Sequence, residues 1–127
     1  LTQASVAYWT SHGFEVGDVQ VVSTPEHGFH AIYLTSNDAA RVATERLAQS
    51  RADAVVMLGT GMPTLATLLA QQGRGGPPVL SCMLALLWQS VTRAASAQTN
   101  GRPSVALQDW LRGAHWAVRA QTMGITP

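Results

Sequence analysis

The chain has 127 residues, a length that fits one domain and leaves no room for two complete halves with a cleft between them. Only 12% of the residues are charged, against about 25% in an average globular protein, which excludes charge-driven disorder and predicts apolar surface that meets a partner. The net charge of +1 predicts neither nucleic acid nor a membrane as that partner. All eight basic residues are arginine, so chemistry that needs a lysine is excluded.

The single cysteine, Cys82, excludes an internal disulfide and a cysteine-rich zinc site. It fits a reducing compartment, and we predict a cytoplasmic protein. The longest apolar stretch, Pro77–Trp88, is shorter than the roughly 20 residues that a membrane span needs. The chain begins at Leu1 without a methionine and with residues of helical spacing, and we expect it to be a fragment or a processed product.

The first quarter of the chain predicts one helix and one strand. Leu1–His12 has a partly helical spacing, and Gly13 stands where a helix-ending glycine is expected. Phe14–Val22 alternates apolar and polar residues and is followed by turn-forming residues, which predicts a strand. The pattern of Glu26–Thr35 is ambiguous.

The middle of the chain predicts a helix, a strand and a second helix. Ser36 or Asn37 is a suitable cap for a helix that runs to about Ser50. Ala54–Leu58 is an unbroken apolar run, typical of a strand buried on both faces of a parallel sheet. Met62–Gln72 regains helical spacing, with its proline expected in the first turn.

The last part predicts one more strand and two helices. Pro78–Leu80 is a second buried strand, and a helix follows over about Leu84–Ala95. Asn100–Pro103 predicts a turn, after which Ser104 caps an amphipathic helix at about 104–120, with its apolar periodicity over Val105–Ala120. Strands that alternate with helices predict a three-layer α/β/α fold around a small parallel sheet.

Parallel sheets bind ligands beyond the carboxyl ends of their strands. Two loops of this kind are predicted here, Gly59–Thr64 after the first buried strand and Ser81–Cys82 after the second. Their glycines, hydroxyls and helix N-termini suit a carboxylate, although glycines in a tight turn alone would produce the same sequence. We expect the two loops to be neighbours at one edge of the sheet.

Two segments, DAVVMLGTGMPTL and GPPVLSCMLALLW, carry a family resemblance. They resemble the maleate isomerase and arylmalonate decarboxylase branch of the aspartate/glutamate racemase superfamily. The matching residues are Asp53, Ala54, Thr60, Pro63, Thr64, Pro78, Val79, Ser81, Ala85 and Trp88. The resemblance covers about residues 1–95 and implies that 1–127 is a single half-domain, the second half of a pseudo-symmetric fold whose first half is absent from this chain.

The resemblance implies a cofactor-independent isomerase, racemase or decarboxylase that acts on small dicarboxylic acids. It places the family's catalytic cysteine at Gly59, which has no side chain, so we expect the chain alone to be inactive. Thr60, Gly61 and Met62 match the carboxylate-binding loop. Cys82 is a weaker substitute for the lost thiol, because it stands at a helix N-terminus that lowers a thiol's pKa. Ser81 completes this edge of the predicted binding site.

Alternatives remain open beside the enzyme. One is a non-catalytic module of the same fold that binds small carboxylates or regulates a partner, and another is an interaction domain without a small ligand.

The resemblance places His27 in a substrate-facing loop. His27 and His30 have i, i+3 spacing, but no further residue with metal-ligand spacing accompanies them, so no metal and no cofactor are expected. The expected partners are a small dicarboxylate and either the absent N-terminal half-domain or a second copy, with Trp110 and Trp116 as interface candidates.

Overall fold

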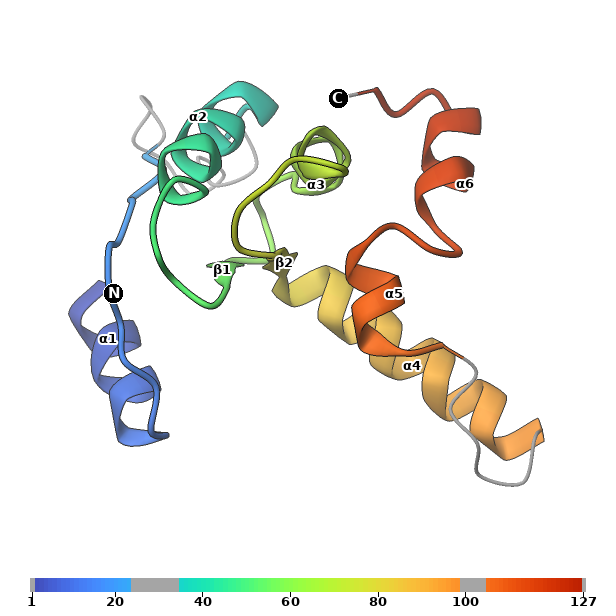
Figure 1. The fold of residues 1–127 in the computed structure, drawn as a ribbon, viewed down its shortest axis with the longest axis horizontal. Helices are drawn as coiled ribbons and strands as arrows, with labels where there is room; N and C mark the ends of the chain where they lie inside the picture. Colours follow the sequence, from blue (N-terminus) through green and yellow to red (C-terminus); the bar gives the residue numbers. More distant parts are fainter. Residues whose placement is uncertain (1, 24–34, 99–104, 127) are drawn as a thin grey trace.

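A computed structural model describes residues 2–23, 35–98 and 105–126. It shows a mixed fold of helices around a two-stranded parallel sheet, which confirms a small α/β architecture. The elements, shown in Figure 1, are α1 (Thr2–Ser11), α2 (Asn37–Leu47), β1 (Val55–Met57), α3 (Leu65–Gln71), β2 (Val79–Ser81), α4 (Cys82–Gln98), α5 (Leu107–Leu111) and α6 (Ala117–Thr122).

The sheet is covered on one face by α2 and α3, which also pack against each other. Val55 and Met57 of β1 point toward these helices and are buried, as is Val79 of β2. Val56 points to the other face and is 38% exposed, and Leu58 just after β1 is 45% exposed. One face of this parallel sheet is therefore open, although such sheets are normally covered on both.

Helix α2 confirms the helix predicted after Ser36. The Ser36 side chain accepts a hydrogen bond from the Ala39 backbone N–H at 3.3 Å, and this cap satisfies one of the free donors of the first turn. Ala40 and Thr44 form the buried stripe of the helix. The helix ends at Leu47, three residues before the predicted end.

Helix α4 extends the prediction in both directions, because it begins at Cys82 and ends at Gln98. The helix predicted over Met62–Gln72 is shorter than expected and starts at Leu65. Its proline, Pro63, lies before the helix and not in its first turn, because the glycine-containing loop continues as far as Thr64. The strand–helix–strand–helix order of this central region is confirmed.

The single C-terminal helix predicted over 104–120 is wrong. In the described residues, α5 and α6 are separate short helices, and the backbone between them takes positive φ at Gly113 (88°) and His115 (72°). Left-handed backbone cannot continue a right-handed helix, so the chain turns back at this point. The side chain of Gln72 donates to the carbonyl of Leu111 at 3.2 Å and holds the turn against the end of α3.

The prediction of Trp110 and Trp116 as interface residues is also wrong. They are only 3% and 7% exposed, and both belong to the hydrophobic core. The Trp110 indole donates to the carbonyl of Leu84 at 3.2 Å, and the Trp116 indole donates to the carbonyl of Trp110 at 2.7 Å. Trp110 therefore anchors α5 to α4, and Trp116 ties the chain before α6 back to α5.

The strand predicted over Phe14–Val22 is not formed. These residues are extended but pair with no strand in the part of the chain that the structure describes, and most of them are exposed. Helix α1, which precedes them, ends before Gly13 (φ 86°) and contains no buried residue. The ambiguous stretch after Ser23, apart from Thr35, and the predicted Asn100–Pro103 turn with its Ser104 cap lie outside the described residues.

Candidate functional site

The carboxyl ends of β1 and β2 meet at one edge of the sheet. The parallel register pairs Met57 with Ser81, so the loop after β1 and the start of α4 leave the sheet side by side. This confirms the prediction that Gly59–Thr64 and Ser81–Cys82 are neighbours. We call these two segments the loop edge.

Two side-chain hydrogen bonds join the halves of the loop edge. Thr64 Oγ1 donates to Ser81 Oγ at 3.2 Å, and Cys82 Sγ donates to the carbonyl oxygen of Gly59 at 3.6 Å. Both bonds link residues about 20 positions apart in sequence. They fix the loop after β1 against the first turn of α4.

Ser81 has a structural role in this arrangement. It is fully buried, and its Oγ accepts from the backbone N–H of Leu84 at 3.1 Å as well as from Thr64. It therefore caps α4 in the manner of an N-cap serine. Any ligand at the loop edge would contact the more exposed neighbours of Ser81 and not its hydroxyl.

Thr64 ends the predicted Gly59–Thr64 loop, but no role was predicted for its side chain. It is buried, and its hydroxyl is the link between the loop and Ser81. Thr64 stands directly before α3, but its side chain makes no cap bond to that helix. Only the packing of the two loops shows what this hydroxyl does.

Gly59 has a backbone conformation that restricts what can replace it. Its φ is 106°, a value that residues with a side chain rarely adopt, while a Cβ placed there would meet no atom within 4 Å. Space for a cysteine side chain exists, but the backbone required for it is strained. The loop at this position is built for glycine.

The accessible part of the loop edge consists of a few small groups. Thr60 is exposed, while Gly61, Met62 and Cys82 are half-buried. The side chain of Met62 packs against the hydrophobic core, so it is the backbone of this residue that remains for a ligand. None of the residues 59–64 or 81–83 carries a charge.

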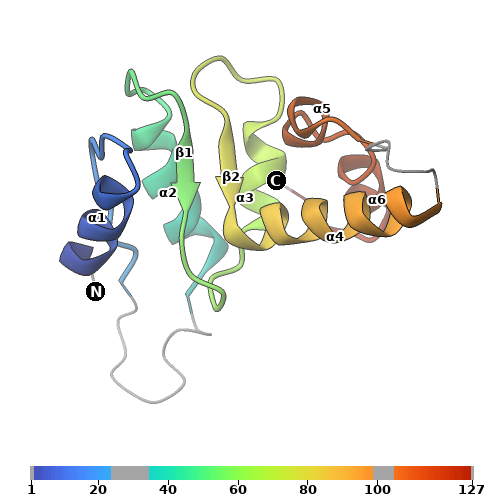
Figure 2. The same ribbon diagram turned by 90° about the horizontal axis from the view of Figure 1, so that it is seen from below.

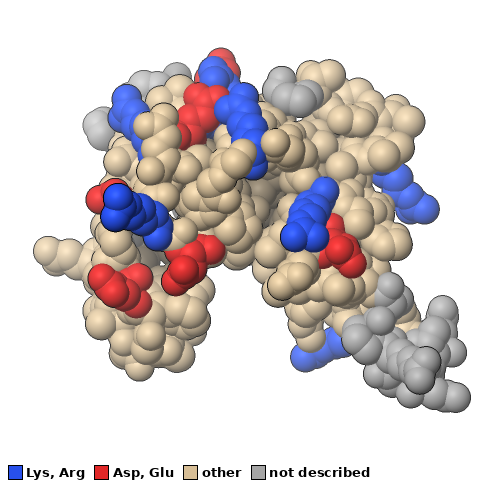
Figure 3. All heavy atoms as spheres, in the orientation of Figure 1, with Lys and Arg blue, Asp and Glu red and all other residues tan. Residues whose placement is uncertain are grey.

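A cluster of ion pairs lies on α2, apart from the loop edge. Glu45 of α2 lies 3.2 Å from Arg41 and 3.1 Å from Arg74, which comes from the loop after α3. Hydrogen bonds from Arg74 and Arg41 lower the pKa of Glu45, and the same carboxylate raises the pKa of Arg41. In Figure 3 charged side chains lie over α2 and at several other places on that face, with uncharged surface between them.

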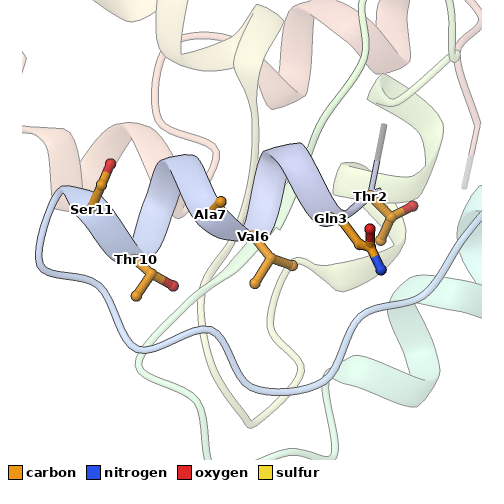
Figure 4. A pocket seen from close by; sticks show the side chains of 6 residues that line it. All are labelled: Thr2, Gln3, Val6, Ala7, Thr10 and Ser11. Atoms are coloured by element: carbon orange, nitrogen blue, oxygen red, sulfur yellow. The ribbon is translucent and has the colours of Figure 1, made fainter.

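Two surface hollows lie apart from the loop edge. One, of about 560 Å³, runs along α1 and is lined by Val6, Ala7 and polar neighbours (Figure 4). The other, of about 350 Å³, lies between Gln20–Ser23 and α2. Neither is lined by a residue of the loop edge.

His27 lies outside the described residues, so the structure does not place it. Across the described ranges, no group of three or more histidine, cysteine, aspartate or glutamate side chains is arranged to hold a metal ion. The same ranges contain no helix long and apolar enough to cross a membrane.

Comparisons of the chain with protein families, curated proteins and solved structures give no match.

Proposed function

We propose that this chain is the second half-domain of a cofactor-independent isomerase, racemase or decarboxylase for small dicarboxylic acids, and that its loop edge binds a carboxylate of the substrate. The observation that carries the proposal is the junction of two strand ends. A glycine loop and the start of a 17-residue helix meet there, joined by the bonds Thr64–Ser81 and Cys82–Gly59.

The donors at this edge suit an anion. The backbone N–H groups in the first turn of a helix have no partner within the helix, and in α4 that of Leu84 is taken by Ser81. The N–H group of Met83, the exposed hydroxyl of Thr60 and the helix dipole remain to hold a carboxylate. Because the edge has no charged side chain, it would bind through dipoles and hydrogen bonds alone.

The thiol of Cys82 supplies the chemistry in this proposal. In reactions at the carbon next to a carboxylate, a thiol can give or take a proton while N–H donors stabilise the enediolate. Cys82 Sγ lies 3.6 Å from the carbonyl of Gly59, the position at which the resemblance places a catalytic cysteine. The opposing proton carrier would come from the other half-domain, so the chain alone has no turnover.

A second candidate is a non-catalytic carboxylate-binding or regulatory module. The backbone of Gly59 favours it, because a φ of 106° disfavours a cysteine at that position. In this case the loop edge binds the anion, and the thiol of Cys82 serves only its hydrogen bond to Gly59.

The proposal includes a three-layer α/β/α arrangement around the sheet. A three-layer α/β/α half of a pseudo-symmetric, cytoplasmic protein would need cover on the open sheet face, where Val56 and Leu58 are exposed. The absent half-domain or a second copy would provide that cover. Sedimentation should then give at least a dimeric mass for the chain alone, and a monomer at high micromolar concentration would contradict assembly through this face.

Titration with malonate, followed by the backbone amide signals, tests binding. The signals of Thr60–Met62 and Cys82–Met83 should shift and saturate, whereas the neutral analogue malonamide should leave them in place. Thr60→Val should weaken binding by several fold, and Thr2→Val on α1 should not change it. Malonate shifts elsewhere on the chain, or none, would contradict the carboxylate site.

Alkylation and turnover separate the two candidates. In the catalytic case, saturating malonate should slow the reaction of Cys82 with iodoacetamide, and Cys82→Ser should abolish the activity reconstituted with a first half-domain. A binding module would keep its malonate affinity in Cys82→Ser and gain no activity from that partner. Turnover of maleate or an arylmalonate by the unmodified chain would show that the catalytic residue has been misplaced.

A further inference from the structure

The N-terminal and C-terminal segments of the described chain carry opposite charge. Between residues 2 and 23 the charged side chains are Glu15 and Asp18, both acidic and both exposed. Between residues 110 and 126 they are Arg112 and Arg119, both basic and both exposed. The ion pairs among the described residues all lie on α2 and the loop after α3. None of these four side chains is therefore neutralised by another described residue.

The two segments lie near opposite ends of the molecule. Helix α1 and the residues after it lie at one end of the long axis and α6 lies toward the other, in both Figure 1 and Figure 2. One copy of the chain cannot bring its acidic residues to its own basic residues across this distance. Two copies arranged head to tail can do so.

The acidic side also presents a rigid group of aromatic rings. Tyr8 and Phe14 are 58% and 56% exposed. The ring of Trp9 lies 5.9 Å from that of Tyr8 and 5.2 Å from that of Phe14, measured between centroids. The N–H of Phe14 donates to the Trp9 carbonyl at 3.2 Å around Gly13, whose φ is 86°, so a helix-ending turn holds the rings in place. We call residues 8–18, with these rings and the two carboxylates, the acidic segment.

The basic side presents aliphatic side chains with its arginines. Val118 and Met123 are 73% and 80% exposed, more than any other large apolar side chain among the described residues. We call residues 112–123 the basic segment. A guanidinium group pairs with a carboxylate and also stacks on an aromatic ring. The basic segment therefore offers the groups that the acidic segment would bind.

From this complementarity we infer that the acidic segment of one copy binds the basic segment of a second copy. The contact is head to tail, so it leaves an acidic segment free at one end of each pair and a basic segment free at the other, and further copies add to them. Only a few side chains meet, which makes the contact small and its affinity low. It uses neither the loop edge nor the open sheet face, so it stands apart from anion binding.

Charge reversal at one segment and its repair at the other test the contact. The mass of the parent chain in sedimentation at low salt should rise with concentration beyond that of a dimer, and about 1 M sodium chloride should lower it. Glu15→Arg with Asp18→Arg should weaken association by about tenfold or more, because both segments are then basic. Arg112→Glu with Arg119→Glu should do the same, because both are then acidic. An equimolar mixture of the two variants should associate again.

A control separates the basic segment from the net charge of the chain. Arg51→Glu with Arg93→Glu gives the same net charge as the reversal at Arg112 and Arg119, and both of these control residues are exposed. This variant keeps both segments intact, so it should associate as the parent chain does. An equal loss of association in the control would overturn the inference, because net charge alone would then explain the effect.

Two further outcomes would overturn the inference. One is a parent mass that neither salt nor either reversal changes, and a constant dimeric mass of this kind would assign assembly to another surface. The other is a mixture of the two reversed variants that stays unassociated. Circular dichroism checks that each variant is folded. Should a reversed variant not fold, the exposed and uncharged change Met123→Ser takes its place, and it should weaken association by several fold; unchanged association would overturn the inference.

Discussion

The two ends of the chain both carry tryptophans, but only one end is packed. Trp9 of α1 is half-buried and meets Phe14 edge-on, with 5.2 Å between the ring centroids. Trp110 and Trp116 are buried in the core, and each indole N–H donates to a backbone carbonyl. The difference shows that an aromatic residue becomes part of a core only where another layer of the fold receives it.

The largest effect expected from this difference is that of Trp110→Ala. Removing a buried tryptophan leaves a cavity and removes the bond to the Leu84 carbonyl, so the free energy of unfolding should fall by about 3–5 kcal/mol. Trp9→Ala, the matched change at the other end, should cost about 1 kcal/mol. Equilibrium urea denaturation measures both values. Equal losses would mean that α1 is packed as firmly as the C-terminal segment.

Two glycines with similar backbone conformation give the next test. Gly13 and Gly113 have φ of 86° and 88°, but a Cβ at Gly113 would lie 2.8 Å from the Cβ of Ala117, while one at Gly13 would meet nothing within 4 Å. Gly13→Ala should lower the free energy of unfolding by about 1 kcal/mol, from backbone strain alone. Gly113→Ala should lower it by about 2–3 kcal/mol, because overpacking adds to the strain. Urea denaturation measures both free energies of unfolding. A larger loss of stability for Gly13→Ala than for Gly113→Ala would contradict the packing of α5 and α6.

Two serine hydroxyls at α4, one at the loop edge and one farther along the helix, should also differ in their effect on stability. Ser81→Ala removes the cap of α4 and leaves the buried hydroxyl of Thr64 without its acceptor, so stability should fall by about 1–2 kcal/mol. Ser90→Ala, on the exposed part of the same helix, should change it by less than about 0.5 kcal/mol. Thermal unfolding followed by circular dichroism measures the loss of stability in both variants. An equally small loss in both would show that the Ser81 hydroxyl is free for a ligand.

The smallest effect concerns pH. Arg74 and Arg41 lower the pKa of Glu45 below its ordinary value of 4.5 in the folded chain. A group with a depressed pKa contributes stability above its unfolded-state pKa, and this contribution is lost as the pH falls through the folded-state value. Below about pH 4.5, the melting temperature should therefore fall slightly more steeply in the parent chain than in Glu45→Gln. Glu15→Gln is the control, and an equally shallow slope in that variant would contradict the assignment to Glu45. High salt should reduce the difference, because these side chains are partly exposed to solvent.

Local sequence patterns were enough to predict the central part of the fold. The Ser36 cap, the apolar runs at β1 and β2 and the helical spacing after each strand are local patterns, and each depends on residues only a few positions apart. The meeting of Gly59–Thr64 with Ser81–Cys82 also followed from sequence, because two parallel strands joined by one helix must end at the same edge.

Features that depend on residues far apart in the chain could not be predicted in this way. Phe14–Val22 has the alternation of a strand but is not one, because a strand needs a partner to pair with and the described residues supply none. Ser81 looked like a ligand-binding hydroxyl until the helix it caps and the approach of Thr64 showed it to be buried. Trp110 is buried because α5 packs on α4, and Trp116 is buried because the turn at Gly113 brings it back to Trp110. Periodicity predicts which face of an element is apolar, whereas only the packed chain shows which surface that face meets.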